Sequence, residues 1–232
     1  MFDYIVWHIT ESEQELLDSL THHEYFAQKV ANLKTGSRRK LEVLAVRLAL
    51  KELFYGKEQI VVYDEHGRPS LAASIKTEPQ IPASKIEAEP QDPEPLPYIS
   101  ISHTADYAAV ITSANPVGID IERRGNRVGR VVRHFLKPEE VARLTLLAGQ
   151  DETLMQLLLH LSWSAKEAAY KVLGHEYYDL QRLTSVTMVS MPLRQITLEV
   201  QGQDQPMVLH FDYTDDYVLT FYSNSSIGKS ET

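Results

Sequence analysis

Two acidic residues, Asp120 and Glu122, interrupt an apolar segment that begins at Val117. The pattern predicts a short strand over Val117–Glu122, in which alternate side chains share a face and lie roughly 7 Å apart. Two carboxylates at that separation repel each other unless a cation lies between them. The segment therefore predicts a cation-binding pair. An ordinary pair of acids on an exposed edge strand is the alternative.

A second segment, Trp163–Lys171, predicts a helix that carries another carboxylate. Glu167 and Lys171 are four residues apart and share a helix face, so they can serve one metal ion and one phosphate. The chain has no cysteine, and oxygen ligands favour Mg²⁺ over zinc. A solvated ion pair is the alternative for these two residues. We expect Trp163 and Tyr170 to be core aromatics that fix the helix.

The two segments together resemble the signature of the 4′-phosphopantetheinyl transferase family, in its long, surfactin-synthetase-activating type. They read Val-Gly-Ile-Asp-Ile-Glu from Val117 and Trp-Ser-Ala-Lys-Glu-Ala-Ala-Tyr-Lys from Trp163. The resemblance covers most of the chain. It implies an α+β fold of two similar α/β halves in a pseudo-twofold arrangement. Each half would be an antiparallel sheet packed with a long helix, and the active site would lie between the halves.

The expected halves are residues 1–114 and residues 115–232. A short internal repeat agrees with this division, because Asp-Tyr and a β-rich run occur at Asp106–Ala114 and again at Asp216–Asn224. The first half contains a Pro- and Glu-rich segment, Lys76–Pro97, with six of the 11 prolines and five acidic residues. We interpret this segment as a mobile insertion loop without a catalytic role.

The resemblance implies transfer of the 4′-phosphopantetheine group from coenzyme A to a serine of an acyl or peptidyl carrier protein, with release of 3′,5′-ADP. This is the activity of a holo-[acyl-carrier-protein] synthase. It implies Mg²⁺ held by Asp120, Glu122 and Glu167, with coenzyme A as the substrate. The implied catalytic residues are Asp120, Glu167 and Lys171, and Glu167 is the candidate general base.

The resemblance also implies coenzyme A contacts spread over both halves. Arg38-Arg39-Lys40 opens a helix whose first turn already carries positive partial charge, and a bound anion would resolve that conflict. Gly67-Arg68-Pro69 stands where the family carries Gly-Lys-Pro, a change that keeps the charge but not the geometry. The implied contacts are Arg39, Lys40, Arg68, Ser102, His103, Lys166 and Lys171.

An arginine-rich segment directly follows the acidic strand. It carries five arginines and no acidic residue in a chain whose net charge is -9. We predict that it docks an acidic carrier protein, and a solvated surface is the alternative. The predicted docking residues are Arg123, Arg124, Arg127, Arg130 and Arg133, with apolar contact from Val128, Val131 and Val132.

Composition limits the remaining functions. The net charge of -9 argues against general nucleic-acid binding. The sequence has no long apolar run, no signal-like N-terminus and no cysteine, so we expect a cytoplasmic monomer without a membrane span. Two other functions stay open. One is a non-catalytic module that binds an acidic partner, and the other is a Mg²⁺-dependent phosphohydrolase that uses water as the nucleophile.

Periodicity and capping signals predict the remaining elements. Helices are expected to begin after the capping residues Thr10–Glu13, at Glu24, at Ser37, at Pro138 and after Asp151. Strands are expected at Met1–Ile9, Gln59–Tyr63, Tyr98–His103, Asp106–Ala114, Val186–Met191, Ile196–Val200, Pro206–Tyr213 and Tyr217–Tyr222.

Overall fold

The computed structural model describes residues 2–33, 36–72, 95–125 and 128–224. Most of the expected insertion Lys76–Pro97, and the expected docking residue Arg127, lie outside these residues. The helices are α1 (Glu13–Asp18), α2 (His23–Ala31), α3 (Ser37–Leu53), α4 (Val128–Val131), α5 (Pro138–Ala148), α6 (Glu152–Leu173) and α7 (Leu180–Leu183). The strands are β1 (Phe2–His8), β2 (Ile60–Tyr63), β3 (Pro69–Ala72), β4 (Tyr98–Thr104), β5 (Tyr107–Ser113), β6 (Val117–Arg123), β7 (Thr184–Ser190), β8 (Gln195–Val200), β9 (Met207–Tyr213) and β10 (Tyr217–Ser223).

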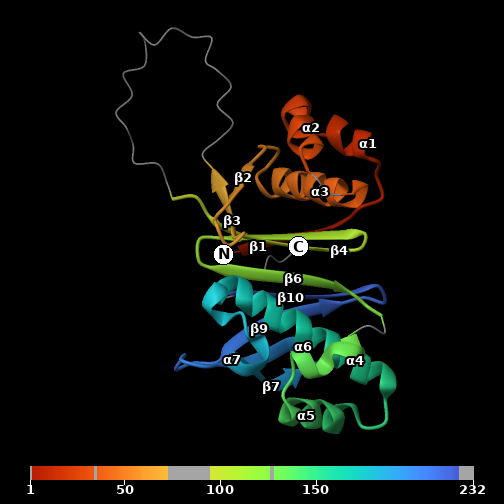
Figure 1. The fold of residues 1–232 in the computed structure, drawn as a ribbon, viewed down its shortest axis with the longest axis vertical. Coiled ribbons are helices and arrows are strands. Elements are labelled where there is room, and N and C mark those ends of the chain that lie inside the picture. Colours follow the sequence, from red (N-terminus) through yellow and green to blue (C-terminus); the bar gives the residue numbers. More distant parts are fainter. Residues whose placement is uncertain (1, 34–35, 73–94, 126–127, 225–232) are drawn as a thin grey trace.

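The strands form two antiparallel sheets and a separate hairpin. The smaller sheet has the order β1-β5-β4, the larger has the order β6-β10-β9-β8-β7, and β2 pairs with β3. Helices α1–α3 cover the smaller sheet and α4–α6 cover the larger one, so the sheets lie between two helical layers (Figure 1). The α+β class is therefore confirmed. The pseudo-twofold relation and the division after residue 114 stay predictions.

Three apolar clusters hold these layers together. One lies between the smaller sheet and its helices and includes Leu44, and another lies between the larger sheet and α6 and includes Leu158. The third joins the two sheets and includes Ile119 and Ile121 of β6. Because alternate residues of a strand face opposite ways, Asp120 points away from the third cluster and toward α6.

The repeated Asp-Tyr sequence opens the second strand of each sheet. β5 pairs antiparallel with β1 from Tyr107 onward, and β10 pairs antiparallel with β6 from Tyr217 onward. The two tyrosine rings lie 4.9 Å apart between centroids, and the Tyr107 hydroxyl donates to Asp216 at 3.3 Å. The repeat therefore marks corresponding strands that meet where the two sheets pack together.

Hydroxyl side chains join β4 to β6 at this junction. Ser100 Oγ accepts from the backbone N–H of Ile119 at 3.1 Å, and Ser102 Oγ donates to Asp120 Oδ1 at 2.8 Å. Thr104 Oγ1 accepts a third bond, at 3.2 Å, from the backbone of β6. These three residues alternate along one face of β4, so they fix its register against the acidic strand.

The helix α6 packs directly on β6 at Gly118. A Cβ atom at this position would lie 2.1 Å from the carbonyl oxygen of Ala168 and 2.7 Å from Cγ2 of Val172. Only a residue without Cβ allows the helix to approach the strand this closely. This close approach places Lys171 Nζ of α6 at 2.9 Å from Asp120 Oδ1.

We expect Gly118→Ala to lower the free energy of unfolding by about 2–3 kcal/mol, because the added methyl group must displace the backbone of α6. Urea denaturation measures the change. Gly125→Ala is the matched control, since a Cβ there meets nothing within 4 Å. Equal losses for the two variants would contradict the close packing at Gly118.

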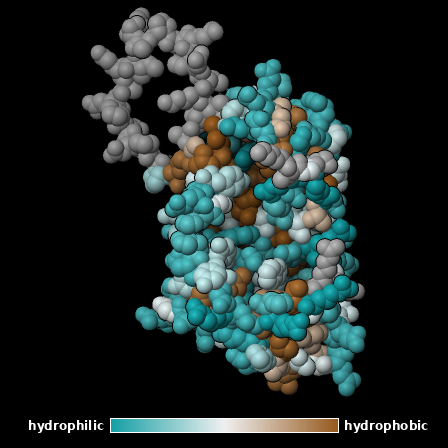
Figure 2. All heavy atoms as spheres, viewed as in Figure 1, coloured by the Kyte–Doolittle hydropathy of each residue, from teal (hydrophilic) through white to brown (hydrophobic). Residues whose placement is uncertain are grey.

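The surface is mostly hydrophilic on the face that Figure 2 shows. Hydrophobic side chains gather over the β2–β3 hairpin, where Val62 and Tyr63 are exposed by 44% and 52%. Tyr63 also forms a wall of the pocket described below. Among the described helices, none is long and apolar enough to cross a membrane.

Several local features differ from the sequence expectations, among them the short helices α4 and α7, which are absent from the predicted elements. The cap of α1 is Ser12, whose side chain accepts from the backbone of Glu15, so the capping box lies two residues beyond the expected Thr10–Glu13. The strand β3 is absent from the predicted elements. It has four residues and begins at Pro69, and such short strands carry little periodicity of their own.

Candidate active site

Asp120 lies at the centre of the site, where β4, β6 and α6 meet. Its side chain is buried, and its Oδ1 accepts from Lys171 Nζ at 2.9 Å and from Ser102 Oγ at 2.8 Å. Its Oδ2 is buried as well and has no hydrogen-bond partner among the described residues. A buried carboxylate oxygen without a partner is costly, so this atom is suited to receive a cation.

Glu122 lies on the same face of β6 and is half-buried. The indole Nε1–H of Trp163 donates to Glu122 Oε1 at 2.8 Å, and the indole ring packs edge-on against Phe135, with centroids 5.1 Å apart. Burial and the charge of Asp120 raise the pKa of Glu122 to about 7. Trp163 therefore packs in the core, as expected, and also orients a candidate metal ligand.

The helix α6 brings Glu167 and Lys171 to the same place. Lys171 Nζ donates to the backbone carbonyl of Ile119 at 2.8 Å in addition to its bond with Asp120. Burial and the Asp120 charge raise the pKa of Glu167, while Lys171 lowers it. The recorded ion pair joins Lys171 to Asp120, so the lysine is part of the site and not of a solvated pair on the helix surface.

The cation that these carboxylates could hold would have to be shared with a bound ligand. The charge of Asp120 raises the pKa of both Glu122 and Glu167, as a like charge does at short range. Within the described ranges, no group of three or more His, Cys, Asp or Glu side chains is arranged to hold a metal ion. Mg²⁺ commonly uses one or two carboxylates together with waters and substrate phosphates. The unpartnered oxygen of Asp120 fits that mode, and the full set of three carboxylate ligands stays a prediction.

Without divalent cations, the protein should lose stability as the pH rises from about 5 to 8. The folded-state pKa of Glu122 is about 7, above its ordinary value of 4.5. The stabilisation is therefore present below the lower value and lost as the pH passes the higher one. We expect a fall of about 2 kcal/mol in the free energy of unfolding, after allowance for solvent screening.

Urea denaturation across this pH range tests the expectation. Glu122→Gln should flatten the profile, and added Mg²⁺ should flatten it in the unmodified protein because a bound cation favours the ionised carboxylate. A pH profile of stability that is already flat in the unmodified protein would contradict the raised pKa of Glu122.

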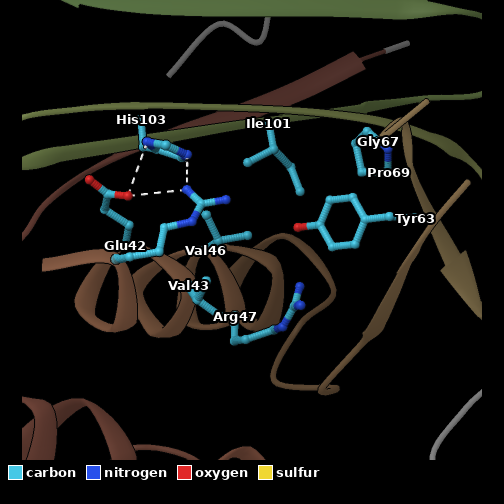
Figure 3. A pocket seen from close by; sticks show the side chains of 10 residues that line it. Glu42, Val43, Val46, Arg47, Tyr63, Gly67, Pro69, Ile101 and His103 are labelled. Atoms are coloured by element: carbon cyan, nitrogen blue, oxygen red, sulfur yellow. Dashed lines mark hydrogen bonds and ion pairs between the residues drawn. The ribbon is translucent and has the colours of Figure 1, made fainter. Parts of the chain in front are cut away.

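A pocket with several cationic side chains lies between α3, β2 and β4 (Figure 3). We call it the cationic pocket, and its lining residues are Arg39, Glu42, Val43, Val46, Arg47, Tyr63, Gly67, Pro69, Ile101 and His103. Glu42 Oε2 lies 3.2 Å from His103 Nδ1 and 3.1 Å from Arg39 Nη1, and Arg39 also contacts His103. Burial and the charge of Arg39 lower the pKa of His103, which favours the neutral ring. Two of the predicted coenzyme A contacts thus lie in one pocket.

A second pocket adjoins the cationic pocket and reaches the C-terminal end of α6. We call it the α6 pocket, and the two pockets share Gly67, Pro69 and Ile101. Lys171 and Tyr170 line it, so Tyr170 faces a pocket and is not the core aromatic that the sequence suggested. Arg68 also lines it and donates to the backbone carbonyls of Lys171 and Val172 at 2.9 and 2.8 Å. Arg68 therefore fixes the end of α6 that carries Lys171.

Two predicted coenzyme A contacts lie elsewhere. Lys166 is fully buried on another side of α6, where its Nζ pairs with Glu140 at 2.9 Å and donates to the Phe135 carbonyl at 2.8 Å. Lys166 and Lys171 are five residues apart, which is about 140° around the helix, so Lys166 faces away from the α6 pocket that Lys171 lines. The structure thus corrects the expectation for Lys166. Lys40 points toward α1, 3.6 Å from Glu13, and lines neither pocket.

The basic residues at the start of α3 do not converge on one anion site. Arg38 pairs with Asp106, while Arg39 turns to Glu42 and Lys40 turns to α1. The hydroxyl of Ser102 on β4 donates its hydrogen bond to Asp120. A contact between this hydroxyl and coenzyme A would therefore have to form in addition to that bond or in place of it.

The arginine-rich segment forms a rim at the far end of β6. Arg123, Arg130 and Arg133 are exposed, and Val131 beside them exposes 44% of its surface. A third pocket runs from this rim to Glu122 and is lined by Val128, Val131 and Trp163 among others. The exposed arginines Arg123, Arg130 and Arg133 are thus accessible, and the docking role of the segment stays a prediction.

Two residues of the segment are held in place. Arg124 is half-buried and donates to the backbone carbonyl of Thr214 at 2.8 Å. The backbone N–H of Gly125 donates to His160 Nε2 at 3.2 Å. Arg124 therefore holds the rim in place, and its guanidinium is not free to pair with a partner protein.

Several site residues were not singled out from the sequence. Ser164 lies 2.8 Å from the Thr220 hydroxyl and donates to the Asp120 carbonyl at 3.2 Å, so it anchors α6 to the acidic strand. Glu42 and Arg47 line the cationic pocket. Arg47 gave one usable signal, a charge within a mostly apolar helical run. Glu42 and Ser164 gave none, because each looks like an ordinary helix residue.

Comparison with protein-family models gives one match on this chain. The model described as the 4′-phosphopantetheinyl transferase superfamily matches residues 116–222. The matched region extends from β6 to β10 and contains Asp120, Glu122, Glu167 and Lys171. The cationic pocket lies outside it. A search of curated proteins found no match.

Proposed function

We propose that the chain transfers 4′-phosphopantetheine from coenzyme A to a carrier-protein serine, and the match of residues 116–222 to the 4′-phosphopantetheinyl transferase superfamily supports this. The transfer would depend on Mg²⁺ and release 3′,5′-ADP. The observation that carries the proposal is the contact of Lys171 with Asp120 at 2.9 Å, within the matched domain and at the end of the α6 pocket.

The proposed reaction must overcome an accumulation of negative charge. The serine oxygen bonds to the phosphorus that carries the pantetheine arm, and the bond from that phosphorus to the bridging oxygen breaks. The bridging oxygen leaves with 3′,5′-ADP. When bound at Asp120, Glu122 and Glu167, Mg²⁺ would supply positive charge to the pyrophosphate. Lys171 would hold a phosphate oxygen from the α6 pocket.

Glu167 is our candidate for the group that receives the serine proton. Burial and the Asp120 charge raise its pKa in the absence of a cation, which suits a general base. Asp120 is less suited, since its Oδ1 already accepts from two donors. The nucleotide would lie along the two adjoining pockets, with Arg39, Arg68 and His103 as its contacts.

Mass spectrometry tests the function directly. The chain is incubated with coenzyme A, Mg²⁺ and an apo carrier protein, and we expect the carrier to gain the mass of one phosphopantetheine arm. Cleavage of coenzyme A without a carrier would favour the phosphohydrolase. A stable complex with no gain in mass would favour the non-catalytic module.

We further propose that the exposed arginines of the rim dock an acidic carrier protein. Replacing Arg127 and Arg130 with glutamate should raise KM for the carrier about tenfold at low salt, because the variant repels acidic side chains. KM for coenzyme A should change little, and the effect should shrink as salt rises. Steady-state kinetics at two salt concentrations measure both constants.

Arg182→Glu on α7 provides the control for that experiment, since Arg182 is an exposed arginine that does not line the pocket at the rim. Equal changes in KM for the carrier and for coenzyme A would place the rim arginines on the nucleotide. A change no larger than that of the control would leave them as a solvated surface.

A further inference from the structure

Glu42 lies inside the cationic pocket, where it neutralises Arg39 and contacts the ring of His103. Its side chain is only 12% exposed, and its Oε2 is within 3.2 Å of both Arg39 Nη1 and His103 Nδ1. Figure 3 shows Glu42 of α3 turned toward His103 of β4. An anion that enters the pocket to reach Arg39 therefore also approaches a buried carboxylate.

Arg47 is the other arginine that lines the pocket, and it lies beyond Arg39 and Glu42 on α3. Its Nη1 is buried and has no hydrogen-bond partner in the described part of the chain. Among the described residues, no carboxylate forms an ion pair with it. A buried guanidinium donor without an acceptor is costly, so this atom is suited to bind an anionic group of a ligand.

The position of this pocket relates it to the phosphates of a bound nucleotide. It shares Gly67, Pro69 and Ile101 with the α6 pocket, and the α6 pocket contains Lys171. A nucleotide whose pyrophosphate lies at Lys171 can therefore place a further phosphate, separate from the pyrophosphate, among Arg39, Arg47 and Glu42. Coenzyme A carries such a separate phosphate, on the 3′ position of its ribose.

We infer that Glu42 is a specificity-determining residue that limits what the 3′-phosphate of coenzyme A contributes to binding. This inference rests on the proposed function. Glu42 neutralises Arg39, and the His103 ring is neutral, so the 3′-phosphate gains mainly from Arg47 and is repelled by the Glu42 carboxylate. The enzyme should therefore accept 3′-dephospho-coenzyme A with a modest loss. A charge-assisted contact with one cation corresponds to a preference of about tenfold.

The first experiment measures binding with two nucleotides that differ only in the 3′-phosphate. Isothermal titration with adenosine 3′,5′-bisphosphate and adenosine 5′-monophosphate gives a ratio of Kd values for each variant, in the presence of Mg²⁺. We expect about tenfold tighter binding of the bisphosphate by the unmodified protein. Glu42→Gln should raise this ratio to about a hundredfold, because it removes the repelling charge but keeps the shape. Arg47→Gln should bring the ratio close to one.

Two further variants control for folding and for general charge. Glu13→Gln also removes a carboxylate that pairs with a cation of α3, but it lies outside the pocket and should leave the ratio unchanged. Arg47→Lys keeps the charge and should retain part of the preference, so a loss of fold in Arg47→Gln does not end the test. The ratio of kcat/KM values for coenzyme A and 3′-dephospho-coenzyme A should follow the same order among the variants.

The outcomes separate this inference from the proposed function. If neither nucleotide binds and no carrier is modified, the proposed function fails and the inference fails with it. If both nucleotides bind but Glu42→Gln leaves their ratio unchanged, or lowers it, only the role of Glu42 is overturned. A preference of a thousandfold or more in the unmodified protein would also overturn it.

Discussion

Replacing Asp120 with asparagine should lower kcat/KM for phosphopantetheine transfer by about a thousandfold, while the protein stays folded. The carboxylate has two tasks that an amide cannot perform. Its Oδ1 holds the ammonium of Lys171 at 2.9 Å as a charged partner. Its Oδ2 is the buried oxygen without a partner, which an asparagine would replace with an N–H donor that repels a cation.

The same change should leave stability equal or slightly raised when divalent cations are absent. The charge of Asp120 raises the pKa of Glu122 and of Glu167, so its removal relieves a repulsion within the site. The loss of the ion pair with the half-buried Lys171 opposes this gain. Thermal denaturation and single-turnover transfer assays measure the two effects separately.

Ser102→Ala serves as the control for Asp120→Asn. It removes one hydrogen bond to the carboxylate and keeps the charge, so we expect a loss of only about tenfold. Activity of Asp120→Asn within tenfold of the unmodified protein at saturating Mg²⁺ would remove Asp120 from the site.

The sequence predicts which residues share a face within the acidic strand and within the helix of Glu167, and the family resemblance implies that these two faces meet. Strand alternation puts Asp120 and Glu122 on one face, and the i, i+4 spacing puts Glu167 and Lys171 on one face. Both periodicities depend only on local backbone geometry. The α+β class followed from the family resemblance, and Gly118 explains why these two faces can approach so closely.

The partners of individual basic residues could not be predicted in the same way. Arg39 and Lys40 are neighbours on α3, yet one lines the cationic pocket and the other pairs with Glu13 of α1. Which neighbour reaches a ligand depends on how α3 is rotated against the smaller sheet. That rotation follows from tertiary packing of residues distant in the sequence, and no local pattern encodes it.

The burial of Lys166 illustrates the same limit. Its partner Glu140 belongs to α5 and also accepts from the backbone of Val186 at 2.7 Å. The ammonium donates in addition to the carbonyls of Phe135 and Thr184, at 2.8 and 3.1 Å. These groups come from separate segments, so the sequence motif shows a lysine next to Glu167 but not the side of the helix that it occupies.

Lys166→Met should therefore lower the free energy of unfolding by about 3–5 kcal/mol, because it leaves the Glu140 carboxylate buried without its counter-charge. The double variant Lys166→Met, Glu140→Gln should recover part of this loss, since it no longer buries an unpaired charge. Urea denaturation of the two single variants and the double variant gives the coupling between the residues.

Lys40→Met is the matched control for Lys166→Met. Lys40 pairs with the partly exposed Glu13 at 3.6 Å, and such surface pairs contribute less than about 1 kcal/mol. The folded fraction of Lys166→Met should bind coenzyme A with an unchanged KM, because the lysine lines neither nucleotide pocket. A small change in stability combined with a tenfold rise in KM for coenzyme A would contradict this expectation. It would indicate that Lys166 contacts coenzyme A and does not form the buried ion pair with Glu140 in solution.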